Sequence, residues 1–344
     1  MYNTTCLDSI FICGCDSLTY IAKGHLPPTL RRLTIEYCKN IRTVLLEEDG
    51  INSTTSLLED LHIGFCTSLE SVTSSGELPA TLKHLFICGC KTLESMAESF
   101  PHNSFLEFIS ITHCGNLKSL PRGIHGLSNL HKLVIESCPN LDPFPDGERE
   151  LLPPNLRWLM IDEACEKMVH GIHNLASLQY LKISSIVSFP EEGFPTNITE
   201  LVIKYLNITE ALFEWGLHRL TSLRRLEIEG GCPHLVSFPT PKMMLPASLT
   251  SLRISSFPNL ESLSSDGFRG LVSLEHLDVA ECEKLTSFPM NDLPPSLLIL
   301  QISKCPLLEE RYKRDQGREW TKIAQIPCVE IDDRLTYREV YLGK

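Results

Sequence analysis

The sequence contains no long apolar run, no excess of basic residues and none of the common motifs for nucleotide or metal binding. A helix that crosses a bilayer needs about 20 consecutive apolar residues, and no stretch approaches that length, so we expect no membrane span. The chain has 31 Lys and Arg residues against 43 Asp and Glu residues, which gives a net charge of −12. Because binding to phosphate backbones requires clustered basic residues, we expect no nucleic-acid partner.

Motifs of enzyme and cofactor chemistry are also missing. There is no G-x-x-x-x-G-K-[ST] phosphate loop, no G-x-G-x-x-G after a strand and no H-E-x-x-H. A Ser/His/Asp triad has no fixed sequence spacing, and nothing in the sequence indicates one. We therefore predict that the protein is not an enzyme and has no catalytic, cofactor or metal-binding residues.

The N-terminus lacks the basic start and the apolar core of a signal peptide. We therefore expect a cytoplasmic protein whose 14 cysteines stay reduced. Eight of these cysteines occupy the same slot of a repeat and are expected to point into the core as small apolar residues. The two C-x-C pairs, Cys13/Cys15 and Cys88/Cys90, favour one exposed and one inward thiol each rather than a metal site.

The dominant feature is an internal repeat, shown most clearly by the stretch LHKLVIESCPNLDPFP at residues 130–145. Its skeleton is L-x-x-L-x-I-x-x-C-x-x-L-x-x-F-P, and it recurs about every 24 residues. That period is typical of leucine-rich repeats. Thirteen units begin at Leu7, Leu30, Leu58, Leu82, Leu106, Leu130, Leu156, Leu178, Ile198, Leu223, Leu249, Leu274 and Leu297.

Each unit combines a short strand with a return segment. The L-x-I alternation predicts a strand with one buried face, and the Cys slot marks the turn that follows it. Five units return through L-P-x-x-L, which is too short and too rich in proline for much helix. The four longer returns, Ile124–Leu130, Ile172–Leu178, Leu217–Leu223 and Phe268–Leu274, have room for a helical turn.

The fold class we predict is an α/β solenoid, a leucine-rich-repeat horseshoe with a parallel β-sheet on its concave face. The convex segments are expected to be mostly irregular, 3₁₀ or short helical. One unit cannot bury its own apolar face, so stability must come from stacking of neighbours. The repeat weakens between about Leu156 and Leu226, where Ile186 and Leu206 replace the cysteine, and we expect a change of curvature or a bulge there.

We predict two domains: a solenoid of about thirteen units at residues 1–308, and a C-terminal cap and tail at residues 309–344. The charged stretch EERYKRDQGRE begins the cap, and apolar residues from Trp320 to Ile331 follow it. The repeat is already running at Leu7, with no equivalent N-terminal cap. Because an uncapped apolar end is a liability, we expect the chain to be a fragment or a truncated product.

Outward slots of the predicted strands would form the concave surface. Large apolar and basic side chains gather in these slots in the middle of the chain, and exposed aromatic residues rimmed by charge are typical of binding hot spots. The predicted partner-binding residues are Phe86, Phe108, Lys132, Trp158, Met160, Tyr180, Lys182 and Arg225. The alternative is that these aromatic residues only stack across neighbouring strands.

Three features carry a resemblance to a known family: the I-x-x-C-x-x-L-x-S-[LF]-P units, the LPPTL, LPATL and LPPSL returns, and the tail RYKRDQGREWTKIAQIPCVEID after Cys305-Pro306-Leu307-Leu308. Over residues 1–332 the chain resembles the C-terminal leucine-rich-repeat region of plant coiled-coil-type nucleotide-binding (NB-LRR) disease resistance proteins. The resemblance implies a cytoplasmic immune receptor whose repeats sense a pathogen effector or a modified host protein. It also implies contact with the nucleotide-binding domain of the same or a related receptor. The sequence contains neither a coiled coil nor that domain, so we expect no autonomous signalling from it.

A second class of protein remains as the alternative, the substrate-recognition repeats of an F-box ubiquitin ligase. Those repeats also carry cysteine in the turn slot, but typically continue C-x-x-I-T-D with longer helices. Here C-x-x-L-x-S-x-P takes that place, and the sequence contains no F-box.

Overall fold

The computed structural model describes residues 6–23, 26–46, 57–74, 76–144, 151–185, 189–190, 192–205, 212, 214–230, 232–240, 243–288, 293–313, 317–332 and 334–338. The chain divides into two compact units, Met1–Leu178 and Gln179–Lys344. This division lies inside the predicted 1–308 solenoid, so the solenoid-and-cap boundary at residue 308 stays a prediction. Each unit is described by itself.

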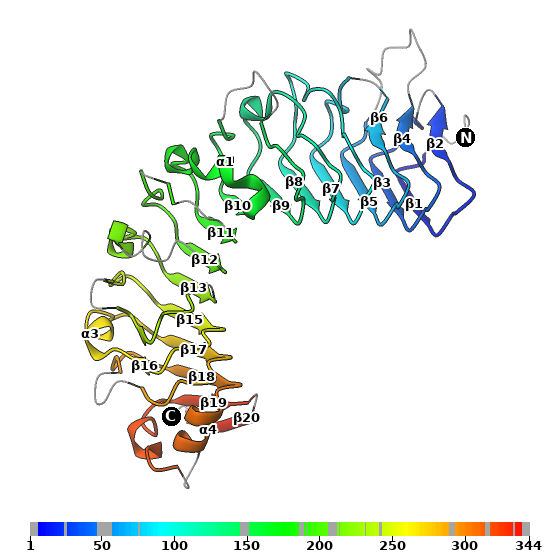
Figure 1. Cartoon of the computed structure of the whole chain (residues 1–344). Coiled ribbons are helices and arrows are strands. Elements are labelled where there is room, and N and C mark those ends of the chain that lie inside the picture. The colour runs from blue at the N-terminus through cyan, green and yellow to red at the C-terminus, as the bar shows by residue number, and fades with distance from the viewer. Residues whose placement is uncertain are drawn as a thin grey trace. The chain divides into compact units, whose positions relative to one another are not determined.

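The main sheet of the first unit is parallel, and its strands follow one another in chain order (Figure 1). Neighbouring strands pair without a register shift: Leu85 lies opposite Ile109, and Ile87 lies opposite Ile111. The strands are β1 (Ser9–Cys13), β3 (Arg32–Glu36), β5 (Asp60–Gly64), β7 (His84–Cys88), β8 (Phe108–Thr112), β9 (Lys132–Glu136) and β10 (Trp158–Ile161).

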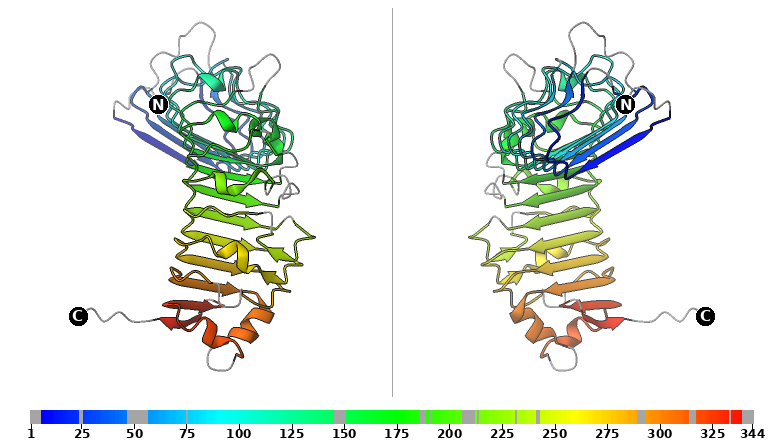
Figure 2. Two further views of the ribbon diagram at one scale, coloured as in Figure 1. Left: turned by 90° about the vertical axis from the view of Figure 1, so that its left-hand side faces the viewer. Right: turned by 90° about the vertical axis from the view of Figure 1, so that its right-hand side faces the viewer.

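The second unit repeats this arrangement, and Figure 2 shows its strands lying one beside the next. Its parallel strands are β11 (Tyr180–Ser184), β12 (Glu200–Lys204), β13 (Arg225–Glu229), β15 (Ser251–Ser255), β17 (His276–Ala280), β18 (Ile299–Ser303) and β19 (Cys328–Ile331). The strand β20 (Arg334–Arg338) then pairs antiparallel with β19. Every predicted repeat unit thus contributes one strand, and the predicted parallel solenoid is confirmed.

The strands form because the L-x-I pattern places every second side chain in the core. In β3, Leu33 and Ile35 are buried while the residues between them face outward. From the second repeat onward, the apolar residue that starts a repeat is buried as well, and so is the Leu after the Cys slot in most of them, for example Leu58 and Leu69. Stacked units therefore share one continuous apolar core, and no unit has to bury its own face alone.

The cysteines behave as buried apolar residues in most units, and all 14 are free thiols. Cys38 Sγ donates to the carbonyl of Glu36, two residues earlier, and Cys114 and Cys138 make the same contact with their own strands. The inward position predicted for Cys15 is wrong, because the thiol of this residue in the first repeat is exposed. Cys165, which lies one residue beyond the Cys slot of its repeat, is buried as well.

The residue that follows most strands of the main sheets turns the chain with a left-handed backbone. Tyr37, Phe65, His113 and Ser137 have φ between 52° and 57°. The amides of Tyr37, Phe65 and His113 donate to the carbonyl at the end of the next strand, as Phe65 does to Cys88 at 2.8 Å. The amide of Ser137 donates instead to the carboxylate of Asp162. The left-handed turn is therefore a property of the repeat slot and does not require glycine.

The return segments carry few helices, as predicted. The 3₁₀ turns η1 (Ile124–Gly126), η3 (Ile172–Asn174) and η4 (Leu217–Arg219) lie in three of the four longer returns, and α3 (Ser265–Phe268) leads into the fourth. The turn η2 (Glu163–Cys165) and the helix α1 (Glu166–Val169) follow β10. In the described part of the chain, no helix is long and apolar enough to cross a membrane.

Two short parallel sheets on the return side were not predicted. One contains β2 (Tyr20–Lys23), β4 (Thr43–Leu46) and β6 (Ser71–Thr73), and the other contains β14 (Ser237–Phe238) and β16 (Ser262–Leu263). Single bridges such as Ser71 with Ser95 and Ser262 with Ser287 extend the same rows. Ser237 and Ser287, which each stand two residues before a proline, still pair with Ser262, because proline removes only its own donor.

In the part of the weakened stretch that belongs to the second unit, strand pairing is continuous. The pairs β11–β12 and β12–β13 keep their register, with Leu201 opposite both Leu181 and Leu226. Ile186 and Leu206, the substituted positions, lie outside the described residues. The change of curvature stays a prediction.

Residues after the last repeat cover the end of the second unit's core. The helix α4 (Pro306–Tyr312) and the turn η5 (Trp320–Lys322) precede β19, which pairs with β18. Tyr312 is fully buried beside Phe288, with ring centroids 5.1 Å apart. Ile323, Ile326 and Val329 are buried too, so these apolar residues of the tail close over the last strand.

Candidate protein-binding surface

The outer face of the sheet carries the residues predicted to bind a partner. In the first unit Phe86, Phe108, Lys132, Trp158 and Met160 lie on β7, β8, β9 and β10 with half-buried side chains. They face outward because the intervening Leu and Ile residues face the core. Met160 lies opposite Val134, and Trp158 lies opposite Lys132.

Four of these residues, together with His62, form a line of contacts across the strands that we call the ring ladder. The rings of His62 and Phe86 lie 5.7 Å apart, and Phe86 meets the ring of Phe108 edge-on at 4.6 Å. Lys132 Nζ lies 4.7 Å from the centroid of Phe108 and 4.8 Å from that of Trp158. The ring ladder is thus His62, Phe86, Phe108, Lys132 and Trp158.

The ladder follows from the parallel register. Neighbouring strands lie about 4.8 Å apart, so side chains in equivalent slots of successive units meet directly. The predicted stacking between strands is therefore present. The stacked side chains also remain half-exposed, so the same residues offer aromatic faces to a partner.

The other three predicted residues belong to the second unit. Tyr180 and Lys182 lie on β11, opposite Glu200 and Val202 of β12. Arg225 lies on β13, and its guanidinium is 3.9 Å from the carboxylate of Glu200. The structure therefore places the predicted residues in two groups, one on each unit.

Charges on the outer face of the second unit are paired. Lys204 makes an ion pair with Glu229 and a second, at 3.5 Å, with Glu227. Burial lowers the pKa of Lys204, but the hydrogen bond and charge of Glu229 outweigh this effect, so the pKa is raised. Arg253 Nη1 bonds Asp278 at 2.6 Å, and burial still raises the pKa of that carboxyl.

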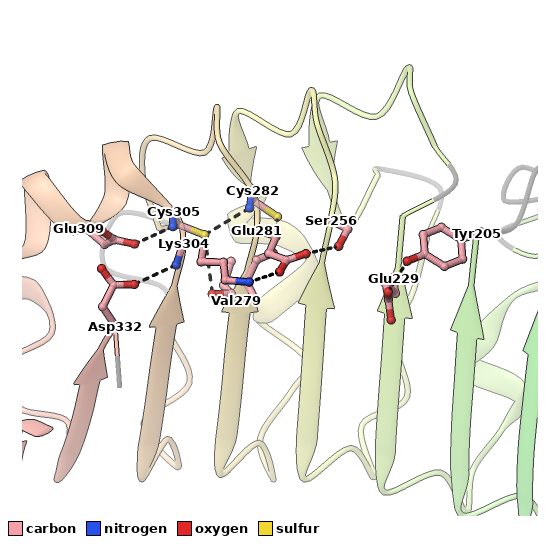
Figure 3. Close-up of polar contacts among 11 residues, drawn as sticks. Tyr205, Glu229, Ser256, Val279, Glu281, Cys282, Lys304, Cys305, Glu309 and Asp332 are labelled. Carbon is pink, nitrogen blue, oxygen red and sulfur yellow. Dashed lines mark hydrogen bonds and ion pairs between the residues drawn. The ribbon is translucent and has the colours of Figure 1, made fainter. Parts of the chain in front are cut away.

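The turn edge of the second unit, where the strands end, is also polar (Figure 3). Tyr205 donates its hydroxyl proton to Glu229 at 2.6 Å, and Glu281 accepts bonds from Ser256 and from Lys304 at 2.9 and 2.6 Å. The adjacent backbone donors of Lys304 and Cys305 are satisfied by Asp332 and Glu309. These carboxylates tie the cap residues to the end of β18.

The turn edge of the first unit is aromatic, and sequence reasoning missed it. Tyr37 and Phe65 stack with centroids 5.0 Å apart and planes 7° apart, and their side chains are 52% and 44% exposed. Each precedes the Cys of its unit. A comparison of the residue before the cysteine in successive repeats would have shown two neighbouring aromatic residues beside the predicted surface.

The described residues contain no group of three or more His, Cys, Asp or Glu side chains placed to hold a metal ion. Cys13 and Cys15 are both exposed, whereas Cys88 is half-buried and Cys90 is buried. The surface features described above are therefore the ring ladder of the first unit and the ion pairs of the second.

Strands of L-x-I pattern in parallel register, a turn slot occupied mainly by buried cysteine, and short return segments define the chain as a leucine-rich-repeat solenoid. No protein-family model matches the chain. Half of it, over 173 residues, is homologous at 36% identity to the Arabidopsis thaliana protein named "Putative disease resistance protein At3g14460". The match spans 12% of that relative, so the chain corresponds to a small part of its length.

Solved structures similar to this chain are leucine-rich-repeat proteins of low sequence identity. An LRR protein of Leptospira interrogans is 14% identical, covers 96% of both chains and has a TM-score of 0.36. The plant peptide hormone receptor RGFR1, solved in complex with RGF2, is 15% identical over 83% of this chain and 76% of its own, with a TM-score of 0.21. The LRR ectodomain of the Arabidopsis thaliana receptor kinase GASSHO1/SCHENGEN3 is 13% identical over 82% of this chain and 52% of its own, with a TM-score of 0.16.

Proposed function

We propose that this chain is the recognition region of a plant intracellular immune receptor. Its outer face binds a pathogen effector or a modified host protein, and this binding regulates defence signalling through the nucleotide-binding domain of the same or a related receptor. The region acts in the cytoplasm and catalyses no reaction. The homology to a plant disease resistance protein supports this class of function over the F-box alternative.

The observation that carries the proposal is the ring ladder. Aromatic side chains are enriched at the centres of protein interfaces because they contribute large contact areas with little loss of conformational freedom. Here they stand on a parallel sheet whose inward residues are fully buried, such as Leu85, Ile109 and Leu133. A rigid support of this kind keeps the entropic cost of binding low.

The test is co-purification from plant cells of proteins bound to the chain. We compare the wild type with the double variant Phe108→Ala and Trp158→Ala. Loss of two hot-spot rings is expected to weaken binding by about 2–4 kcal/mol, enough to remove the partner from the purified fraction. Met244→Ala is the matched control, since Met244 is an apolar residue 64% exposed in a return segment.

We expect a set of proteins that the wild type and the Met244 variant retain and the double variant loses. The same proteins in equal amounts with all three chains would refute the outer face as the binding surface. Retention of ubiquitin-ligase subunits by all three would favour the F-box alternative.

A further inference from the structure

The neighbours of Lys132 differ from those of the three arginines on the outer face. Arg32, Arg225 and Arg253 each contact a carboxylate, namely Asp8, Glu200 and Asp278. Within the described residues no carboxylate lies within ion-pair distance of Lys132. Its neighbours across the strands are instead the two rings of Phe108 and Trp158.

Two rows of outward slots at the centre of this surface also lack acidic residues, while Glu136 lies outside them at the far end of β9. The third and fifth slots of the units that contain β7, β8, β9 and β10 hold eight outward side chains, and none is Asp or Glu. The nearest acidic slot in these two rows is Asp60 of β5, and its carboxylate contacts His84. Lys132 is therefore an uncompensated positive charge in an aromatic setting, on a chain whose net charge is −12.

A lysine ammonium has three donors, and aromatic faces attract its charge without supplying lone pairs for those donors. A carboxylate supplies both an opposite charge and acceptor oxygens. The flanking rings restrict access of water, which strengthens a charge-assisted hydrogen bond at this position. The geometry thus fits an anion that is itself flanked by apolar groups.

The charge of this protein and the contact area of the surface indicate which class of molecule supplies that anion. A polyanion such as nucleic acid would meet one cation on an acidic protein, which is too little for phosphate binding. A small carboxylic acid would be held by a single ammonium on an open sheet face. An acidic side chain in a protein segment adds apolar neighbours that cover Phe108 and Trp158.

We infer that Lys132 determines partner specificity by binding an Asp or Glu side chain that has apolar residues beside it in the partner's chain. This inference rests on the proposed function, because it assigns the chemistry of the partner to the same surface. It makes Lys132 the polar contact at the centre of an otherwise aromatic hot spot. Binding then depends on the charge of Lys132 in addition to the area of the rings.

The test uses a library of displayed random peptides as the probe, selected on the folded wild-type chain. Selected peptides are measured against Lys132→Met, Lys132→Arg, and the double variant Phe108→Ala and Trp158→Ala. Methionine keeps an unbranched apolar stem between the rings and removes the charge, whereas arginine keeps the charge. Circular dichroism and unfolding midpoints establish that each variant is folded.

We expect peptides that require the rings to be enriched in Asp and Glu beside apolar residues. A charged hydrogen bond contributes about 1.5–3 kcal/mol, so Lys132→Met should weaken their binding about tenfold or more. Lys132→Arg should retain most of the affinity. Binding to the wild type should also weaken as salt is raised, because part of the attraction is screened.

The outcomes separate the inference from the proposed function. Peptides that lose binding to the ring variant but bind the Lys132→Met chain as well as the wild type overturn the inference alone. Selected peptides that are indifferent to both variants overturn both. Failure to select any peptide that needs Phe108 and Trp158 likewise overturns both.

Discussion

The ring of Phe65 lies directly against the backbone of Gly89, and a Cβ atom placed on Gly89 would approach Phe65 Cδ1 to 2.5 Å. Gly89 occupies the left-handed turn slot with φ of 67°. Residues with side chains occupy the same slot in other units, among them His113 at φ of 55°. The neighbouring ring, more than the backbone angle, is therefore what demands glycine here.

Gly89→Ala should lower the free energy of unfolding by about 1–3 kcal/mol, because Phe65 must leave its stacked position on Tyr37. Denaturant unfolding followed by circular dichroism measures the change. In a Phe65→Ala background the same substitution should have a smaller effect. Gly115→Ala is the control, since a Cβ there meets no atom within 4 Å. Equal losses with and without Phe65 would show that the backbone, and not the ring, is limiting.

Glu229→Gln should remove part of the pH dependence of stability that the wild type shows. Burial raises the pKa of Glu229, but hydrogen bonds from Lys204 and Tyr205 outweigh it, so the pKa lies below its ordinary value of 4.5. Since the folded-state pKa is lowered, the stabilisation is present above pH 4.5 and is lost as pH falls through the folded-state pKa. Unfolding midpoints of both chains at neutral and acidic pH measure the difference.

At neutral pH we expect Glu229→Gln to be less stable than the wild type by about 1.5–3 kcal/mol, since Lys204 and Tyr205 then donate to a neutral amide oxygen in place of a carboxylate. This difference in stability between the two chains should disappear at acidic pH. Glu70→Gln provides the control, because its ion pair with Arg42 is largely exposed and contributes little. A gap that stays constant from neutral to acidic pH would argue against the ion pair as the cause.

The thiols should fall into two kinetic classes toward an aromatic disulfide reagent. Cys6, Cys13 and Cys15 are exposed, whereas Cys165 is buried and burial raises the pKa of its thiol. Because the thiolate is the reactive form, buried cysteines should react only as the chain unfolds. Replacing the three exposed cysteines and the half-buried Cys88 and Cys328 with serine should remove the fast phase. A fast phase that persists in this variant would mean that the stacked thiols are accessible in the folded chain.

Tyr312→Phe should loosen the end of the second unit. The buried hydroxyl donates to Glu319 at 2.8 Å and accepts from the amide of Phe288 at 3.3 Å. Leaving a buried donor unpaired costs about 1–3 kcal/mol. Hydrogen exchange at the Phe288 amide should therefore rise. Tyr205→Phe should have a smaller effect, because Tyr205 is 51% exposed and water replaces its lost bond. Similar losses in the two variants would contradict a role for burial.

Much of the fold was predictable because each unit repeats one local rule. The L-x-I alternation of β3 or β9 specifies a strand and its buried face, and the recurrence every 24 residues or so specifies parallel neighbours. The longer returns at Ile124, Ile172 and Leu217 were correctly assigned room for a helical turn. The short strand pairs through Ser71 and Ser262 were not predicted.

The candidate surface separates what the sequence determines from what only the tertiary structure determines. By itself, the sequence determined which side chains face outward, since inward and outward positions alternate along every strand. It placed Phe108, Lys132 and Trp158 in equivalent slots of successive units. Only the tertiary structure decided that His62 joins their line, that Lys132 lies between two rings and that Phe65 covers Gly89. Those facts depend on rotamers and on distances between units, which no local pattern encodes.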